Sequence, residues 1–324
     1  MTVPVLSLRN LTVEIPSRHG VVRPVDSLSY DIGNGEILGV VGESGAGKSM
    51  AGSAIIGLLN PPAHIAGGEI WLNGTRIDTM GREQMRRIRG KEIGMVFQDP
   101  LTSLNPLLTI GDQLVETMLT HLPISRSQAQ HRAIDALKEV GIPGAKERID
   151  SYPHEFSGGM RQRVVIALAL CAEPSLVIAD EPTTALDVSV QAQIIALLKR
   201  LCRERGTTIM LITHDMGVIA EAADRVAVMY AGRLAELGPV RDVLTQPQHH
   251  YTHGLMASTP LAAQGQKRLH QIPGSMPRLD RMPEGCAFHP RCPNAKEKCR
   301  HETKPSMEGG RAACWYPVSA EAVA

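Results

Sequence analysis

The sequence predicts an α/β nucleotide-binding fold, and two features of this 324-residue chain carry the prediction. A glycine-rich loop at residues 42–49, GESGAGKS, follows an apolar run at 37–41 and precedes a helix-forming stretch. A second apolar run, at 175–179, ends in an acidic pair. Short, fully apolar runs that alternate with helices are typical of a parallel sheet covered on both faces.

Composition narrows the possible functions. The formal net charge is +1 and 43% of the residues are hydrophobic, so the chain can bury a sizeable core and has no basic surplus for nucleic acid. No apolar run is long enough to span a bilayer, and the N-terminus does not resemble a signal peptide. We therefore expect a cytoplasmic protein without nucleic-acid partners, whose membrane association depends on other subunits.

The N-terminal quarter reads as short strands separated by turns. Turn-forming residues at 17–20 and 33–35 divide the apolar runs, and Asn73-Gly74 is typical of a hairpin. A helix after the glycine-rich loop is expected to end before the prolines at 61–62, which cannot continue it. The expected strands are 5–8, 12–15, 28–32 and 37–41, and a hairpin at 68–77.

After a strand at 93–97, the chain becomes helical. Ala133, Leu137 and Val140 recur at the spacing of one helix face. Strands return at 175–179, 207–213 and 225–230, with helices expected at 190–205 and 240–244. Beyond residue 246 periodicity fades. We predict a nucleotide-binding domain at 1–245, with a helical subdomain at about 100–172, and a small Cys-rich domain at 246–324.

The glycine-rich loop has the pattern of a phosphate-binding loop. Its glycines allow successive N–H groups to point inward, and the following helix N-terminus favours an anion. Lys48 is placed to reach the β- and γ-phosphates, and the Ser49 hydroxyl to hold Mg²⁺. An accidental glycine turn is the alternative. The predicted ATP-binding residues in this stretch are Gly42, Ser44, Gly45, Ala46, Gly47, Lys48, Ser49 and Met50.

Asp180 and Glu181 follow the apolar run at 175–179. A carboxylate at the end of such a strand can hold Mg²⁺, often through water, because Mg²⁺ prefers hard oxygen ligands. The adjacent Glu181 is placed to polarise an attacking water, which makes it one of two predicted catalytic residues. The alternative is that Asp-Glu-Pro merely begins a surface turn.

Residues 156–163, FSGGMRQR, resemble the signature motif of ABC-transporter ATPases. Phe156 and Met160 depart from its usual Leu-Ser-Gly-Gly-Gln form, whereas Ser157, Gly158 and Gly159 match it. A small hydroxyl residue and two glycines before a helix form a second anion site. The resemblance implies a P-loop ABC ATPase core with antiparallel β and helical subdomains. It also implies a head-to-tail dimer in which each signature closes over the partner's ATP.

Other positions match the same family in order. Gln98 resembles the glutamine that senses Mg²⁺ and the γ-phosphate, which adds it to the ATP site and, with Ser49 and Asp180, to the Mg²⁺ site. His214 resembles the switch histidine that contacts the γ-phosphate and is the other predicted catalytic residue, although a histidine at a strand end can also be a simple polar cap. Residues 185–187, Ala-Leu-Asp, resemble the D-loop.

The adenine contact departs from the family pattern. The family usually stacks adenine on an aromatic residue near the end of the first strands, and no Phe, Tyr or Trp precedes Tyr30 here. The equivalent position is Ile15, which leaves Ile15, Arg18 and His19 as candidates.

The tail narrows the resemblance to dipeptide and oligopeptide importer ATPases. Residues 249–252 (HHYT), 272–274 (IPG) and 283–292 (PEGCAFHPRC) resemble their C-terminal region, and 98–106 (QDPLTSLNP) also matches. In that family a four-cysteine pattern binds a [4Fe–4S] cluster. The resemblance carries this cluster onto Cys286, Cys292, Cys299 and Cys314.

The cysteine residues themselves leave alternatives open. Four thiolates in a loop-rich segment can also hold zinc, with His289 and His301 nearby as substitutes, or remain free thiols. The spacing lacks the paired CxxC knuckles of common zinc ribbons. In either metal-bound form the expected role is structural, because a segment poor in apolar periodicity needs a staple. Cys171 and Cys202 lie in apolar stretches and are expected to be buried.

The resemblance implies an ATPase that powers peptide import at the cytoplasmic face of the bacterial inner membrane. Its implied partners are a second related ATPase or another copy, two transmembrane permease subunits, and a periplasmic or lipid-anchored solute-binding protein. Nickel chelates, glutathione and D,D-dipeptides are alternative solutes within the family. Two further alternatives are a soluble ABC ATPase acting on nucleic acid and an iron–sulfur redox sensor. The single cassette and the absence of a basic stripe disfavour the first of these.

Overall fold

The computed structural model describes residues 3–18, 20–184, 186–259, 271–302, 304–307 and 310–318. The chain divides into two compact units, each built from segments that are distant in sequence. The first unit comprises Met1–Val5, Gly33–Glu36 and Thr79–Leu211, and the second comprises Leu6–Ile32, Ile37–Asp78 and Ile212–Ala324. We describe each unit by itself.

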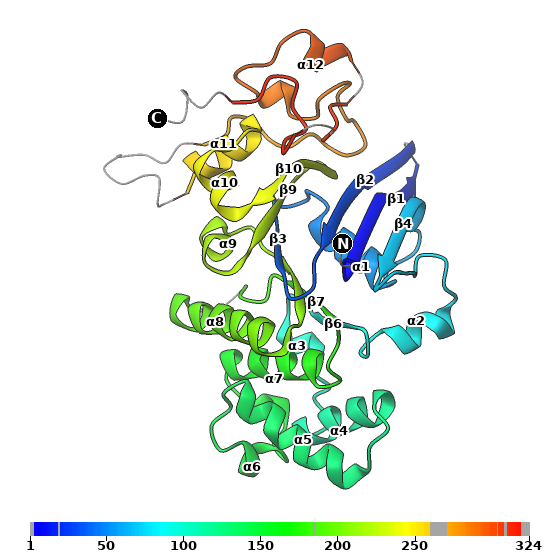
Figure 1. The fold of residues 1–324 in the computed structure, drawn as a ribbon, viewed down its shortest axis with the longest axis vertical. Coiled ribbons are helices and arrows are strands. Elements are labelled where there is room, and N and C mark those ends of the chain that lie inside the picture. Colours follow the sequence, from blue (N-terminus) through cyan, green and yellow to red (C-terminus); the bar gives the residue numbers. More distant parts are fainter. Residues whose placement is uncertain are drawn as a thin grey trace. The chain divides into compact units, whose positions relative to one another are not determined.

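The second unit contains an antiparallel sheet (Figure 1). Its strands, in the order β2-β1-β4-β5, are β1 (Leu6–Ser17), β2 (Gly20–Ile32), β4 (His64–Leu72) and β5 (Thr75–Arg76). Asn73 and Gly74 both have positive φ, as a tight hairpin turn requires, which confirms the predicted hairpin. The separate strands expected at 5–8 and 12–15 are instead one strand, because Asn10 at φ 50° absorbs a register shift without ending the pairing.

The second unit also holds the strand that precedes the glycine-rich loop. All five residues of β3 (Ile37–Val41) are buried, as the apolar run predicts. β3 pairs in parallel with β9 (Arg225–Tyr230), which pairs antiparallel with β10 (Arg233–Pro239). Helices α1 (Lys48–Ile55), α9 (Met216–Ala222), α10 (Val240–Thr245) and α11 (His250–Ala257) complete this part. β10 was not predicted from sequence, because its buried positions include the carboxylate of Glu236.

The first unit contains the strands β8, β7 and β6 in that spatial order. Their bounds are Thr208–Ile212, Leu176–Asp180 and Ile93–Val96, within one residue of the predictions at each start. β6 and β7 run parallel. The helices are α2 (Arg82–Ile88), α3 (Pro100–Ser103), α4 (Ile110–His121), α5 (Arg126–Glu139), α6 (Ala145–Arg148), α7 (Gly158–Leu170) and α8 (Val188–Arg205).

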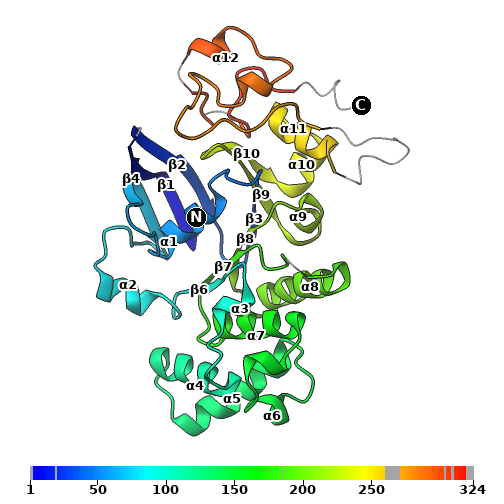
Figure 2. The same cartoon turned by 180° about the vertical axis from the view of Figure 1, so that it is seen from behind.

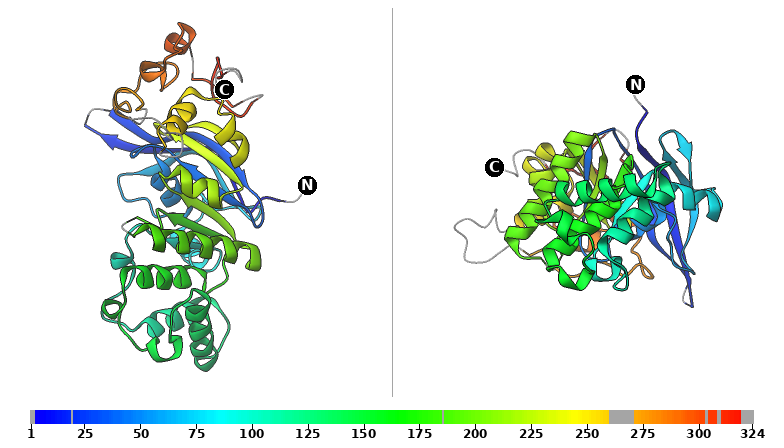
Figure 3. Two further views of the ribbon diagram at one scale, coloured as in Figure 1. Left: turned by 90° about the vertical axis from the view of Figure 1, so that its left-hand side faces the viewer. Right: turned by 90° about the horizontal axis from the view of Figure 1, so that it is seen from below.

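Local capping explains where the helices of the predicted helical segment begin. The Thr109 hydroxyl accepts from the Asp112 N–H at 3.1 Å at the start of α4. Ser125 and Gln128 form a reciprocal capping box at the start of α5. The predicted face of α5 is confirmed, since Ala133 and Leu137 are fully buried. In Figure 3 the helices of this segment, α4 and α5 among them, are the green ones that pack side by side.

The described residues beyond 246 contain little regular structure, as the fading periodicity predicts. They include α11, the 3₁₀ turn η3 (His289–Arg291) and α12 (Lys298–His301). Figure 2 shows α11 next to β10. Backbone hydrogen bonds attach this segment to β10. The Leu237 N–H donates to the Arg311 carbonyl at 2.8 Å, and the Ala313 N–H donates to the Ala235 carbonyl at 2.9 Å. We call the described residues from 246 to 318 the C-terminal extension. Within the described part of the chain, no helix is both long and apolar enough to cross a bilayer.

Candidate functional site

The glycine-rich loop joins β3 to α1, and neighbouring backbone dictates its glycines. Gly42 has φ 153° and Gly47 has φ 98°. A Cβ on Gly42 would lie 2.2 Å from the Met229 carbonyl oxygen, and one on Gly47 would lie 2.0 Å from that of Pro24. Real Cβ atoms do not approach carbonyl oxygens so closely. The loop therefore takes this path only because both positions lack a side chain.

The loop curls around the ammonium group of Lys48. This side chain is buried, and its Nζ donates to the carbonyl oxygens of Gly42 at 2.8 Å and Glu43 at 3.1 Å. Ser44, Gly45 and Ser49 are exposed along the same loop. A cation enclosed by a loop at a helix N-terminus is an arrangement that attracts a phosphate.

The acidic pair lies at the end of β7 in the first unit. Asp180 is buried, whereas Glu181 is half-buried and has φ 46°, a strained conformation for a residue with a side chain. The Glu181 carboxylate accepts from the Gln98 amide at 3.2 Å and from the Thr184 hydroxyl at 2.9 Å. The structure thus brings Gln98 and Glu181 together, although they are far apart in sequence.

The Ser-Gly-Gly stretch forms the N-terminus of α7. Ser157 is the N-cap, its hydroxyl accepting from the Met160 N–H at 3.4 Å, and both Ser157 and Gly158 are exposed. A Cβ on Gly159 would lie 2.8 Å from Cγ1 of Val190 on α8, so this glycine permits close helix packing. The site faces solvent at the end of a 13-residue helix, which suits a second anion contact.

The remaining predicted site residues are distributed between the units. In the second unit, His214 is exposed directly after Thr213, whose N–H donates to Val40 of β3 at 3.1 Å. Ile15 is half-buried in β1, and Arg18 is exposed at the adjoining turn. In the first unit, Asp187 caps α8 by accepting from Val190 at 3.0 Å. His19 and Ala185 lie outside the described residues.

Comparison with known proteins places these features in a family. The family model described as "ABC transporter" matches residues 25–184. The model described as "Oligopeptide/dipeptide transporter, C-terminal region" matches residues 235–299. The dipeptide transport ATP-binding protein DppD of Bacillus subtilis (strain 168) is 49% identical over 296 residues, which cover 91% of this chain and 88% of that protein. The chain belongs to the ATP-binding subunits of dipeptide and oligopeptide ABC transporters.

Further relatives extend the match along nearly the whole ABC subunit. The oligopeptide transport protein OppD of Escherichia coli (strain K12) is 47% identical, covering 97% of this chain and 93% of that protein. Among solved structures, a dimeric post-hydrolysis state of the ATP-binding cassette MJ0796 bound to ADP and Pi has a TM-score of 0.66 and 28% identity. It covers 73% of this chain and 99% of that one. The chain therefore has the ABC ATPase fold with antiparallel and helical subdomains, and it hydrolyses ATP.

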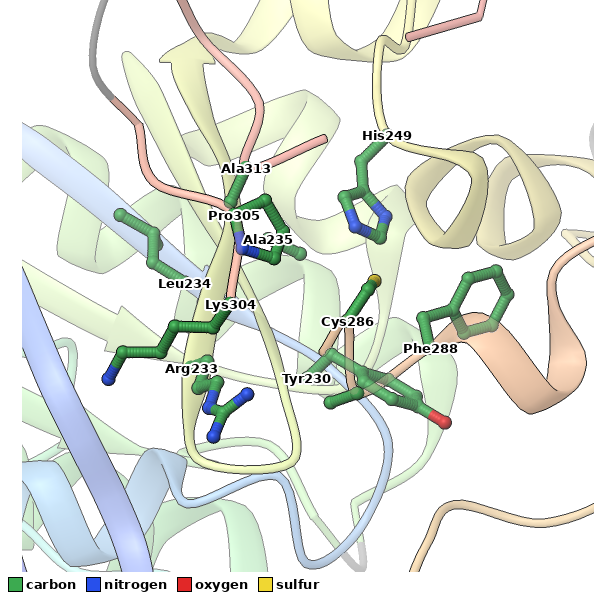
Figure 4. Close-up of a pocket in the computed structure, with 11 residues that line it drawn as sticks. Tyr230, Arg233, Leu234, Ala235, His249, Cys286, Phe288, Lys304, Pro305 and Ala313 are labelled. Carbon is green, nitrogen blue, oxygen red and sulfur yellow. The ribbon is translucent and has the colours of Figure 1, made fainter. Parts of the chain in front are cut away.

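The four cysteines of the extension lie around one small cavity in this ABC subunit. Cys286, Cys292, Cys299 and Cys314 line a space of about 10 Å³, together with aromatic and histidine side chains. Burial raises the pKa of Cys286 and of Cys292, and raises that of Cys314 to about 11. Figure 4 shows Cys286 next to His249, Tyr230 and Phe288.

The expected Cys-rich metal domain is not supported by this geometry. No group of three or more His, Cys, Asp or Glu among the described residues is arranged to hold a metal ion. A space of about 10 Å³ admits at most one water molecule, so the side chains pack against one another around it. Four thiols are nevertheless a donor set whose chemistry suits an iron–sulfur or zinc site.

Sequence reasoning missed two residues that contact the phosphate-binding loop of this ABC subunit. Arg291 binds the Glu43 carboxylate, and the Tyr251 hydroxyl accepts from the Glu43 N–H at 2.9 Å. Both lie in the extension, more than 200 residues along the chain from Glu43. The one indication in the sequence was Glu43 itself. A negative charge inside a phosphate-binding loop is stabilised by a nearby cation, so an arginine or lysine partner could have been expected.

Proposed function

We propose that this chain powers the import of dipeptides or oligopeptides through ATP-driven closure and reopening of an ATPase dimer. The observation that carries the proposal is the enclosed Lys48 in a phosphate-binding loop, in a chain about half identical to a dipeptide transport ATP-binding protein. Gly42, Gln98 and the residues from Ser44 to Met50 would bind ATP, with Ser49, Asp180 and Gln98 around Mg²⁺. The ion supplies positive charge that neutralises the phosphates.

Within this proposal, Glu181 and His214 carry the chemistry. Glu181 would orient and polarise the attacking water, and Gln98 and Thr184 hold its carboxylate at 3.2 and 2.9 Å. His214 would contact the γ-phosphate from its exposed position after Thr213. The left-handed backbone of Glu181 supports an active role, because strained residues gather at functional sites.

The second anion contact is proposed to act on another subunit. Ser157 and Gly158 are exposed at the N-terminus of α7, and Gly159 permits its packing. The similar cassette MJ0796 is dimeric. We propose a head-to-tail dimer with a second related ATPase or a second copy, docked on two permease subunits at the cytoplasmic face of the inner membrane. A periplasmic or lipid-anchored protein would deliver the solute, and no nucleic acid takes part.

A mixing experiment tests the composite site. Ser157→Arg blocks the signature and Lys48→Ala disables the phosphate-binding loop, so each variant alone should be inactive. Mixed dimers of the two combine one intact loop with one intact signature. The mixture should recover about a quarter of the wild-type ATPase rate, because half of randomly formed dimers carry one intact site of two.

The matched control mixes Ser157→Arg with the double variant Ser157→Arg/Lys48→Ala, which leaves no intact signature. ATP hydrolysis is measured by phosphate release. Recovery in the first mixture and none in the control supports a site shared between two copies. Equal, negligible rates in both would assign the partner role to a different, related subunit.

We further propose that the four cysteines hold a [4Fe–4S] cluster, with zinc as the alternative. The support is the presence of all four thiols along one small cavity and the match of residues 235–299 to the peptide-transporter C-terminal region. Protein purified without oxygen should contain iron and sulfide and absorb broadly near about 400 nm. Cys292→Ser should lose the iron, whereas the buried Cys202→Ser of α8 should retain it. Zinc in place of iron in the wild type and in Cys202→Ser, lost in Cys292→Ser, would identify the alternative.

The proposed solute rests on relatives. DppD and OppD are named for dipeptide and oligopeptide transport, and a probable D,D-dipeptide transport protein of Escherichia coli (strain K12), DdpD, is 45% identical over 98% of this chain. D,D-dipeptides therefore stand as the second candidate. Glutathione and nickel chelates are further candidates. Identifying the solute-binding protein that co-purifies with the transporter, and the solute it carries, decides between them.

A further inference from the structure

The C-terminal extension reaches the phosphate-binding loop through a buried arginine. Arg291, at the end of η3, donates from one nitrogen to both carboxylate oxygens of Glu43 at 3.0 Å. The Arg291 side chain is 7% exposed and that of Glu43 is 28% exposed. A pair with one buried and one partly exposed partner differs from surface pairs, because loss of either partner leaves a charge that water cannot fully solvate.

The surroundings hold Arg291 in one position. Its Nε donates to the Pro273 carbonyl at 2.9 Å and its Nη2 to the Ile272 carbonyl at 3.5 Å, while the nitrogen that binds Glu43 also donates to the Tyr230 hydroxyl at 3.3 Å. The guanidinium also lies 6.0 Å from the ring centre of Phe288. Every partner except Tyr230 and Glu43 belongs to the extension, so the side chain is oriented toward the loop by the segment that carries it.

Two further contacts join the extension to the same loop. The Tyr251 hydroxyl accepts from the Glu43 N–H at 2.9 Å, and a Cβ on Gly45 would lie 3.1 Å from the Met276 methyl. Tyr251 packs with Tyr230 and Phe288, at centroid distances of 4.6 and 5.5 Å. The chain has only three Phe and five Tyr, and three of these eight rings pack together at this contact.

Electrostatics gives this contact a consequence for ATP. A carboxylate within a phosphate-binding loop repels a bound triphosphate, and a paired arginine cancels that charge. We propose that Arg291 is a positioning residue for ATP binding: it neutralises Glu43 and holds the loop, so that the C-terminal extension is part of the nucleotide site. This inference rests on the proposed ATP function.

Coupling of this kind works in both directions. Disturbing the extension weakens ATP binding, and weakening the Glu43 pair loosens the extension. A structural change in residues 286–302 therefore alters the affinity for ATP, since Arg291 lies in this segment, between Cys286 and Cys292. The coupling needs no assumption about what the cysteines hold.

The test measures ATP affinity of the full-length chain by calorimetry. Arg291→Ala should raise the ATP Kd about tenfold, the order expected for one uncompensated charge near a phosphate at protein-surface dielectric. The rate at saturating ATP should change by less than about twofold, since nothing that reacts is altered. Arg291→Lys should recover part of the affinity, and Arg291→Ala/Glu43→Gln should recover most of it, because no uncompensated carboxylate remains.

Arg278→Ala is the matched control, since it removes an exposed arginine of the same extension whose pairing with Asp280 at 2.8 Å lies on the surface. It should leave the Kd unchanged. An unchanged Kd in Arg291→Ala, or a double variant as weak as the single one, overturns the inference. A wild-type chain that fails to bind ATP would instead contradict the proposed function.

A second arm does not depend on the folding of Arg291→Ala. Glu43→Gln changes only the partly exposed loop residue, and it should speed amide hydrogen exchange in 286–302 several-fold by weakening the pair that anchors Arg291. Unchanged exchange in that segment overturns the inference independently of any ATP measurement.

Discussion

Replacing Glu181 by glutamine is expected to abolish ATP turnover while leaving ATP binding intact. The amide keeps the size of the carboxylate and can still contact Thr184, but it cannot accept a proton from water. Removing a positioned general base typically costs about 10²- to 10⁴-fold in rate. Phosphate release should therefore fall by at least about a hundredfold, and calorimetric titration should give an ATP Kd close to that of the wild type.

Glu204→Gln is a suitable control, because it makes the same chemical change at an exposed position near the end of α8. Its ATPase rate should equal that of the wild type. Undiminished hydrolysis in the Glu181 variant would remove Glu181 from the catalytic role. Loss of ATP binding together with hydrolysis would mean that the substitution disturbs the strand end rather than the chemistry.

Gly47→Ala is expected to weaken ATP binding about hundredfold through backbone geometry alone. The new methyl would lie 2.0 Å from the Pro24 carbonyl oxygen, at a φ of 98° that residues with side chains rarely adopt. The loop must move, and Lys48 and Ser49 move with it because they follow directly. A distortion of about 3 kcal/mol at the site weakens binding about hundredfold. The thermal midpoint should fall as well, since strain of this kind also destabilises the fold.

Gly67→Ala provides the comparison in the same unit. A Cβ at Gly67 in β4 meets nothing within 4 Å, and its backbone does not require glycine. This variant should match the wild type in both ATP affinity and thermal midpoint. Equal ATP affinity in the Gly47 and Gly67 variants would contradict the geometric account of the loop.

Much of the fold was predictable because strands buried in a parallel sheet appear in the sequence as short runs of apolar residues. β3 and β9 occur at the predicted residues 37–41 and 225–230, since both consist mostly of apolar residues and are bounded by turns. The hairpin at Asn73-Gly74 was predictable for a different reason, because few residue pairs adopt two positive φ angles. The phosphate-binding loop was recognisable because its glycines are required where the backbone passes close to other backbone.

Elements whose identity depends on distant partners were not predicted. β10 carries the buried Glu236, whose carboxylate accepts from the backbone N–H groups of Gln248 and His249 at 2.9 Å. No local pattern marks such a strand, because its polar group is satisfied only after the extension folds onto it. The short helix α9 was missed for a different reason, because seven residues offer too little periodicity to indicate a helix.

By itself, the sequence determined the chemistry available to this ATPase: a glycine-rich loop with Lys48, an acidic pair after a buried strand, and a Ser-Gly-Gly helix start. These are local arrangements, and short-range backbone preferences are enough to specify them. Only the tertiary structure decided what stands around the loop. The pairing of Glu43 with Arg291 joins residues 248 positions apart, and the spacing of a sequence says nothing about which distant charges will be buried together.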